Sequence, residues 1–94
     1  MKKIIWRRIA ERDRDRIFDR IAKENPRAAI ELDMQFEENA ALALQRPNLY
    51  KPGRVRDTRE IVTRPNYVMV YRADVSGITI LRVLHARRKW PLEE

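Results

Sequence analysis

A short stretch near the C-terminus carries most of the residues that could do chemistry. It contains His85, the only histidine among the 94 residues, followed by Arg87, Arg88, Lys89 and Trp90. Histidine has an ordinary pKa near neutrality, and guanidinium groups hold phosphate or carboxylate with paired hydrogen bonds. A proton shuttle beside positioned cations is sufficient for phosphodiester cleavage without a metal. The alternative is a histidine at the end of a strand that is hydrogen-bonded to the backbone.

Other catalytic arrangements find little support. Cysteine is absent, so the chain has no thiol nucleophile, no disulfide and no thiolate ligand for zinc. Gly53 and Gly77 are the only glycines and form no glycine-rich phosphate loop, and no serine lies near the histidine in a triad pattern. Glu37 and Glu38 are adjacent on an expected helix and point in different directions, which favours a role in solubility. We expect no metal and no cofactor.

The charge distribution favours an anionic partner. The net charge is +7, and residues 51–89 hold eight arginines and two lysines against three acids. Aromatic residues lie among these bases, at Tyr50, Tyr67, Tyr71 and Trp90. A small domain of this kind suits nucleic acid, a nucleoprotein or an acidic protein. The alternative is charge that serves only solubility.

The first half of the chain is expected to form a strand and a helical hairpin. Residues 3–6 hold three apolar residues after Lys3, two of them β-branched, and apolar residues then recur near a 3.6-residue period from Arg8 to Lys23. Asn25 and Pro26 are a cap and a first-turn residue for a second helix, which extends to about Leu44.

The second half is expected to form the sheet. Pro47, Pro52 and Gly53 mark a loop, and residues 74–77 mark a hairpin turn. The candidate strands are residues 55–58, 60–63, 67–73 and 78–85. Strand alternation would place Leu81, Val83, His85 and Arg87 on one face. We predict one α+β domain, residues 1–94, with the helical hairpin packed on a curved, mainly antiparallel sheet of four to five strands.

The first helix has an unusual run of charge. Residues 11–16 alternate in sign, and Asp13 and Arg14 interrupt the apolar stripe. The run is either a solvated face or a surface that shows charge to a partner. No apolar run approaches the ~20 residues that cross a bilayer, and the N-terminus does not fit a signal peptide. We expect a cytoplasmic protein with no membrane partner.

Three segments carry a resemblance to a known family. They are NPRAA from Asn25, GRVRDTREIVTRPNYVMVYR from Gly53, and ILRVLHARRKWP from Ile80. In this order they resemble the RelE/ParE superfamily of toxins from bacterial type II toxin–antitoxin modules, also called plasmid-stabilisation modules. The resemblance covers nearly the whole chain. It implies a growth-arresting toxin and a cognate antitoxin with an acidic, partly disordered C-terminal segment that wraps and neutralises it.

The superfamily has two kinds of target. RelE-like members cut mRNA in the ribosomal A site, using the 2′-hydroxyl group as the nucleophile and no metal, whereas ParE-like members poison DNA gyrase. The RVLH ending at His85 is more similar to ParE. We therefore expect a gyrase poison. The alternatives are a ribosome-dependent, metal-free mRNA endonuclease and a non-catalytic nucleic-acid-binding module.

The resemblance also implies roles for individual residues. In a nuclease, Arg87 matches the arginine on the scissile phosphate, Arg64 falls near a second cation, and His85 would shuttle a proton. Trp90 is the aromatic residue nearest to the C-terminal tyrosine of RelE-like members, and it carries no titratable proton. Arg14 stands where the family usually has leucine, which implies a thinner core or a surface that a partner covers. The expected target-binding residues are Arg59, Arg64, Arg87, Arg88, Lys89 and Trp90.

Overall fold

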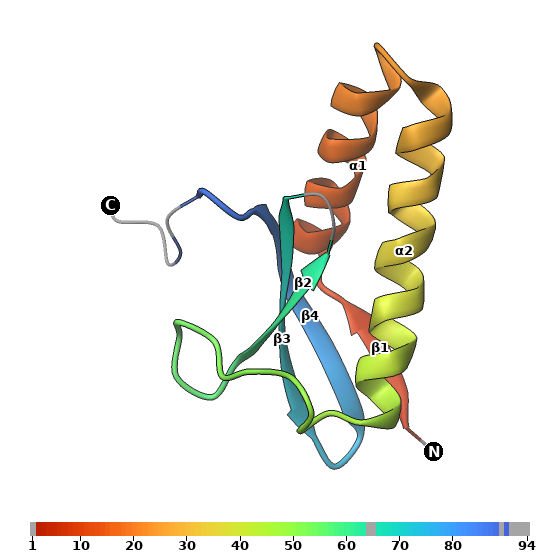
Figure 1. Ribbon diagram of the computed structural model, residues 1–94. Coiled ribbons are helices and arrows are strands. Elements are labelled where there is room, and N and C mark those ends of the chain that lie inside the picture. The colour runs from red at the N-terminus through yellow and green to blue at the C-terminus, as the bar shows by residue number, and fades with distance from the viewer. Residues whose placement is uncertain (1, 64–65, 89, 91–94) are drawn as a thin grey trace.

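The chain folds into two helices packed on one face of an open four-stranded sheet (Figure 1). The computed structural model describes residues 2–63, 66–88 and 90. The elements are β1 (Lys3–Trp6), α1 (Arg8–Ala22), α2 (Pro26–Gln45), β2 (Arg59–Thr63), β3 (Tyr67–Asp74) and β4 (Gly77–His85). The strand order is β1-β4-β3-β2, with β1 parallel to β4 and the other neighbours antiparallel. The predicted α+β fold is confirmed.

The helical hairpin follows from the signals in the sequence. The Asn25 side chain accepts a hydrogen bond from the Ala28 backbone N–H at 3.1 Å, and Pro26 is the first residue of α2. The apolar stripe of α2 is buried as predicted, at Ala29, Leu32, Phe36, Ala40 and Ala43. These side chains pack on the sheet, so α2 supplies much of the core.

Buried residues lie on both faces of the sheet, and a β-bulge changes which residues of β4 belong to each face. The pairing of β3 with β4 shifts register between Val70 and Tyr71. Val83 therefore lies in the core under the helices, whereas Leu81 belongs to a second cluster with Val68, Val70 and Leu84, against which Trp90 packs. The expectation that Leu81 and Val83 share one face is wrong, because simple alternation takes no account of the extra residue.

The expected strand at residues 55–58 is also wrong. This segment is part of a loop in which Asp57 has a φ of 63°. Glu60, which is buried, accepts hydrogen bonds from the Arg54 backbone N–H at 2.9 Å and from Arg54 Nε at 3.1 Å. The Tyr71 hydroxyl donates to the Pro47 carbonyl at 2.6 Å. The Glu60 side chain of β2 and the Tyr71 side chain of β3 thus hold the loop between α2 and β2, in which a strand at residues 55–58 had been expected.

Arg14 is satisfied within the chain itself. Its guanidinium group contacts the Asp33 and Glu37 carboxylates at 2.9 and 2.8 Å and lies 4.4 Å from the centre of the Trp6 ring. Burial alone would lower the pKa of Arg14, but its hydrogen bonds to these carboxylates outweigh that effect and raise it. The acids of α2 therefore cover Arg14, and neither a thinner core nor a partner is needed to explain it.

Candidate functional site

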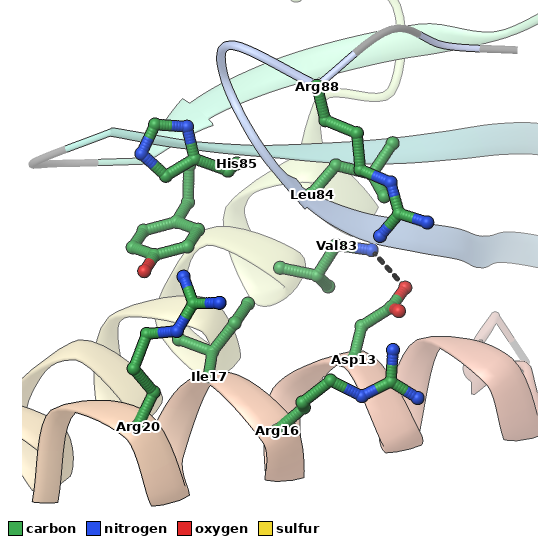
Figure 2. A pocket seen from close by; sticks show the side chains of 9 residues that line it. Asp13, Arg16, Ile17, Arg20, Val83, Leu84, His85 and Arg88 are labelled. Atoms are coloured by element: carbon green, nitrogen blue, oxygen red, sulfur yellow. Dashed lines mark hydrogen bonds between the residues drawn. The ribbon is translucent and has the colours of Figure 1, made fainter. Parts of the chain in front are cut away.

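A cavity of about 160 Å³ lies between α1 and the end of β4 (Figure 2). Arg16 and Arg20 extend into it from α1, and Arg88 extends from the turn after β4 on the opposite wall. Its lining residues are Asp13, Arg16, Ile17, Arg20, Tyr67, Val83, Leu84, His85 and Arg88. We call this cavity the basic pocket. It combines the sequence-predicted histidine with cations from two distant segments.

Asp13 connects α1 to β4 at the base of the pocket. Its carboxylate is buried and accepts hydrogen bonds from Arg82 Nε at 2.8 Å, from Arg82 Nη2 at 3.0 Å and from the Val83 backbone N–H at 3.0 Å. β1 pairs with β4 only as far as Ile80, so the rest of this β4 edge lacks a neighbouring strand. The carboxylate takes the place of a strand acceptor there. The expectation that Asp13 belongs to a solvated or partner-facing run is wrong.

His85 is held in a tight turn. Its Nδ1 accepts a hydrogen bond from the Arg87 backbone N–H at 3.1 Å, and its carbonyl accepts one from the Arg88 N–H at 2.9 Å. Its ring meets Tyr67 edge to face, with the ring centres 5.5 Å apart. The backbone hydrogen bond that the sequence left as an alternative is thus present. In the neutral imidazole with this bond, the proton sits on Nε2.

The arginines of the pocket have no acidic partner within the described ranges. Arg16, Arg20 and Arg88 form no ion pair with any described side chain, because Asp13 is already engaged by Arg82. The pocket therefore has an excess of three positive charges beside His85. Such a site attracts carboxylate or phosphate groups.

The structure brings only part of the predicted site together. His85 and Arg88 line the pocket, and Arg87 is an exposed residue of the adjacent turn. Arg59 lies at the other end of β2 and donates from Nη1 to the Tyr50 carbonyl at 2.7 Å. Trp90 packs on the sheet face opposite the helices, with the Arg82 guanidinium 5.5 Å from its ring centre. The predictions for Arg64 and Lys89 fall outside the described residues.

Sequence reasoning missed the contribution of α1. The sequence places Arg16 only in the charged run of residues 11–16 and Tyr67 only among the aromatic residues that lie between bases, and it singles out no role for Arg20. A signal was present, because four arginines recur at every fourth position of α1, at Arg8, Arg12, Arg16 and Arg20. This spacing gives a continuous row on a helix. No group of three or more potential metal ligands occurs in the parts of the chain that the structure describes. Within those same parts, no helix is long and apolar enough to cross a membrane.

Comparison with known proteins places this chain in a family of toxins. The family model described as the ParE toxin of the type II toxin–antitoxin system parDE matches residues 4–90. The chain is 33% identical over 91 residues to a protein named "Putative toxin Y4kP" from Sinorhizobium fredii, and the match covers 96% of this chain and 94% of the relative. The chain belongs to the ParE toxin family of type II toxin–antitoxin systems. Membership in this family implies a cognate antitoxin partner.

A solved structure shares the fold. It is described as the chromosomal ParDE TA system from P. aeruginosa, and one of its chains aligns with a TM-score of 0.82 at 24% sequence identity. The alignment covers 93% of this chain and 98% of the other. The strand, helical hairpin and sheet expected from the resemblance are thus those of a solved ParDE-system chain.

Proposed function

We propose that this toxin arrests growth by poisoning DNA gyrase, and that it acts by binding rather than by catalysis. The observation that carries the proposal is the hydrogen bond from the Arg87 N–H to Nδ1 of His85. Membership in the ParE family supports the choice of target. The RVLH ending at His85, which is more similar to ParE than to RelE, agrees with it.

The hydrogen bond at Nδ1 makes His85 a poor general base. Neutral His85 in this arrangement carries its proton on Nε2, so the nitrogen that remains accessible donates and does not accept. Accepting a proton at Nδ1 would cost the hydrogen bond to Arg87. The Asp13 carboxylate, the other candidate base in the pocket, is saturated by Arg82 and Val83. Among the described residues, no other carboxylate or imidazole lines the pocket. A general base must be free to accept the proton it removes.

Two purified assays test this proposal. The toxin is added to gyrase acting on relaxed plasmid, and separately to ribosomes translating a defined message. The proposal expects inhibited supercoiling and an intact message. Normal supercoiling together with a message cut at codon-spaced positions would reject it. If neither activity is affected and induction in cells is harmless, the chain is better described as a non-catalytic nucleic-acid-binding module.

A RelE-like nuclease is the second candidate, and one observation favours it. Arg16, Arg20 and Arg88 line the same pocket as His85 and form no ion pair with a described residue, and their positive charge would stabilise a pentacovalent phosphate there. Arg87 and Arg64 would hold the scissile phosphate. His85 would have to release the Arg87 N–H and take up a proton at Nδ1 before the imidazolium could donate a proton from Nε2 to the leaving group. This candidate needs a separate base for the 2′-hydroxyl group. Cleaved message in the ribosome assay would establish it.

We also propose that the antitoxin segment which binds this toxin is acidic and partly disordered before binding. The net charge of +7 favours such a partner, and electrostatic attraction speeds the association of oppositely charged chains. Affinity should then fall as salt concentration rises, because mobile ions screen exposed charges. Affinity that is unchanged between low and high salt would contradict the proposal.

A further inference from the structure

We propose that the basic pocket receives an acidic side chain of the antitoxin, and that Arg16 and Arg20 of α1 hold its carboxylate together with Arg88. This inference rests on the proposed acidic character of the antitoxin and does not depend on the toxin's target. It assigns a binding role to Arg16 and Arg20, which are not among the site residues that the resemblance to RelE-like toxins implies.

The pocket provides three cations, and the one carboxylate in its described lining, Asp13, is already bound by Arg82. Arg16 and Arg20 lie one helical turn apart on α1, and Arg88 faces them from the turn after β4 (Figure 2). None of the three is ion-paired to a described residue. Three guanidinium groups around one cavity repel one another, and a bound carboxylate relieves that repulsion through charge-assisted hydrogen bonds.

The size and floor of the pocket favour a protein side chain over a nucleotide. Its volume of about 160 Å³ is well below the 300–1,000 Å³ of sites that hold a small-molecule ligand. The floor holds the apolar side chains of Ile17 and Val83 beside the buried Asp13 carboxylate. The methylene groups of an aspartate or glutamate would contact this floor while the carboxylate reaches the arginines at the rim.

The surface of α1 beside the pocket also combines positive charge with exposed apolar surface. The row formed by Arg8, Arg12, Arg16 and Arg20 is exposed and repeats at about 6 Å. Ile9 lies seven positions before Arg16, so it shares that side of the helix, and its side chain is 44% exposed. Basic residues around an exposed isoleucine suit a protein partner better than a phosphate backbone. An acidic helix with a carboxylate at every fourth residue has a matching repeat.

The α1 acids lie beside the row but outside the pocket. Glu11, Asp15 and Asp19 each follow an arginine of the row by three positions, which places them about 60° around the helix axis from that arginine. None of these three acids lines the pocket. The excess of positive charge is therefore a property of the pocket lining, where Arg16, Arg20 and Arg88 accompany one carboxylate, Asp13, which Arg82 already binds.

The wall that carries Arg88 is already ordered. The backbone N–H of Arg88 donates a hydrogen bond to the His85 carbonyl at 2.9 Å, and the Arg88 carbonyl accepts one from Arg54 Nη1 at 3.3 Å. The Ala86 N–H donates to the Asn66 carbonyl at 2.6 Å. These bonds fix the turn before a partner arrives, and fixing it in advance reduces the entropy that binding costs.

The test compares two double variants of the full-length toxin. Arg16→Ala with Arg20→Ala removes two positive charges from the pocket, whereas Arg27→Ala with Arg46→Ala removes two from exposed positions on or beside α2. The probe is the full-length antitoxin from the neighbouring reading frame, with affinity measured by calorimetry or interferometry. We expect the pocket variant to bind at least about 100-fold more weakly and with a smaller salt dependence, and the control to stay within about 3-fold.

Further measurements show whether a loss of affinity comes from the pocket charges and not from misfolding. Thermal unfolding of both variants should match the wild type, because all four arginines are exposed. An Arg16→Glu, Arg20→Glu toxin should regain affinity for an antitoxin in which one acidic residue is changed to arginine, found by scanning its acids. Equal antitoxin affinity for the pocket variant and the control would overturn the proposal. Loss of oligonucleotide binding with unchanged antitoxin affinity would overturn it in favour of a phosphate site.

Discussion

At the scale of residues, two side chains settle how the end of β4 is built. The Asp13 carboxylate accepts hydrogen bonds from the Arg82 guanidinium and the Val83 N–H, and His85 Nδ1 accepts one from the Arg87 N–H. In each case a group that could have served chemistry is engaged in holding the backbone. Among the described residues, the charged groups that remain without a partner around the pocket are arginines, which bind anions and do not transfer protons at neutral pH.

Replacing Asp13 by alanine should destabilise the toxin by about 3–5 kcal/mol, because Arg82 and the Val83 N–H would lose their buried acceptor. The free energy of unfolding from urea denaturation measures this loss. Asp15→Ala is the matched control, since Asp15 is exposed on the same helix, and it should change the free energy by less than about 0.5 kcal/mol. Equal effects of the two substitutions would show that the Asp13 contacts contribute little.

Tyr71 should make stability depend on pH in the alkaline range. Burial raises the pKa of its hydroxyl above the ordinary value of 10.0, although nearby Arg59 acts in the opposite direction. Because the folded pKa is the higher one, the contribution to stability is present below pH 10 and is lost as pH rises through the folded pKa.

Comparison with Tyr71→Phe tests this effect. The variant loses the hydrogen bond to the Pro47 carbonyl, so it should be less stable than the wild type at neutral pH by about 1 kcal/mol. The difference should shrink above pH 10, as followed by chemical denaturation at several pH values. A difference that stays constant into that range would argue that Tyr71 does not titrate with a raised pKa.

At the scale of elements, the short first strand shapes the site. β1 ends at Trp6, which pairs with Ile80, and the chain then turns directly into α1. Among the described residues, this leaves the last residues of β4 paired only with β3, and it brings α1 alongside their other edge. The basic pocket exists because a helix occupies the place of a strand at this edge.

The docking of β1 depends on Gly77. This residue has a φ of 137°, and a Cβ there would collide with the backbone of Lys3, its partner in the pairing. Gly77→Ala should therefore cost more than about 2 kcal/mol in thermal or chemical unfolding. Val75→Ala in the same turn, where the side chain is 96% exposed, should cost less than about 0.5 kcal/mol. A well-tolerated Gly77→Ala would mean that β1 is not held as described.

Sequence patterns located both helices and the four strands of the sheet, but they also predicted a strand at residues 55–58 that is a loop, and they did not reveal the contacts between elements. The periodicity of α2 and the cap at Asn25 located the hairpin, because these are local properties of the chain. The bulge at Val70 and Tyr71 and the loop at residues 55–58 depend on pairing with distant segments, which no local pattern encodes. His85 and Arg88 were found as site residues from their types. Arg16 and Arg20 were not, because only the packing of α1 against β4 brings them there.

At the scale of the whole molecule, the toxin is a basic protein whose core is supported by internal acid–base pairs. Asp33 and Glu37 cover Arg14, Glu60 holds Arg54, and Asp13 holds Arg82. These pairs use many of the well-placed acids for structure. The net charge of +7 is thus left on the surface, including the α1 row and the pocket. An anionic partner is the natural complement of such a surface.

The central claim is that this toxin acts by binding and that His85 transfers no proton. His85→Gln tests it most directly, since glutamine keeps a polar side chain but cannot act as a general acid or base. We predict that the purified variant inhibits gyrase supercoiling at a concentration within about 3-fold of the wild type and still arrests growth. A loss of activity of about 100-fold or more, accompanied in the wild type by cleavage of ribosome-bound message, would contradict the claim.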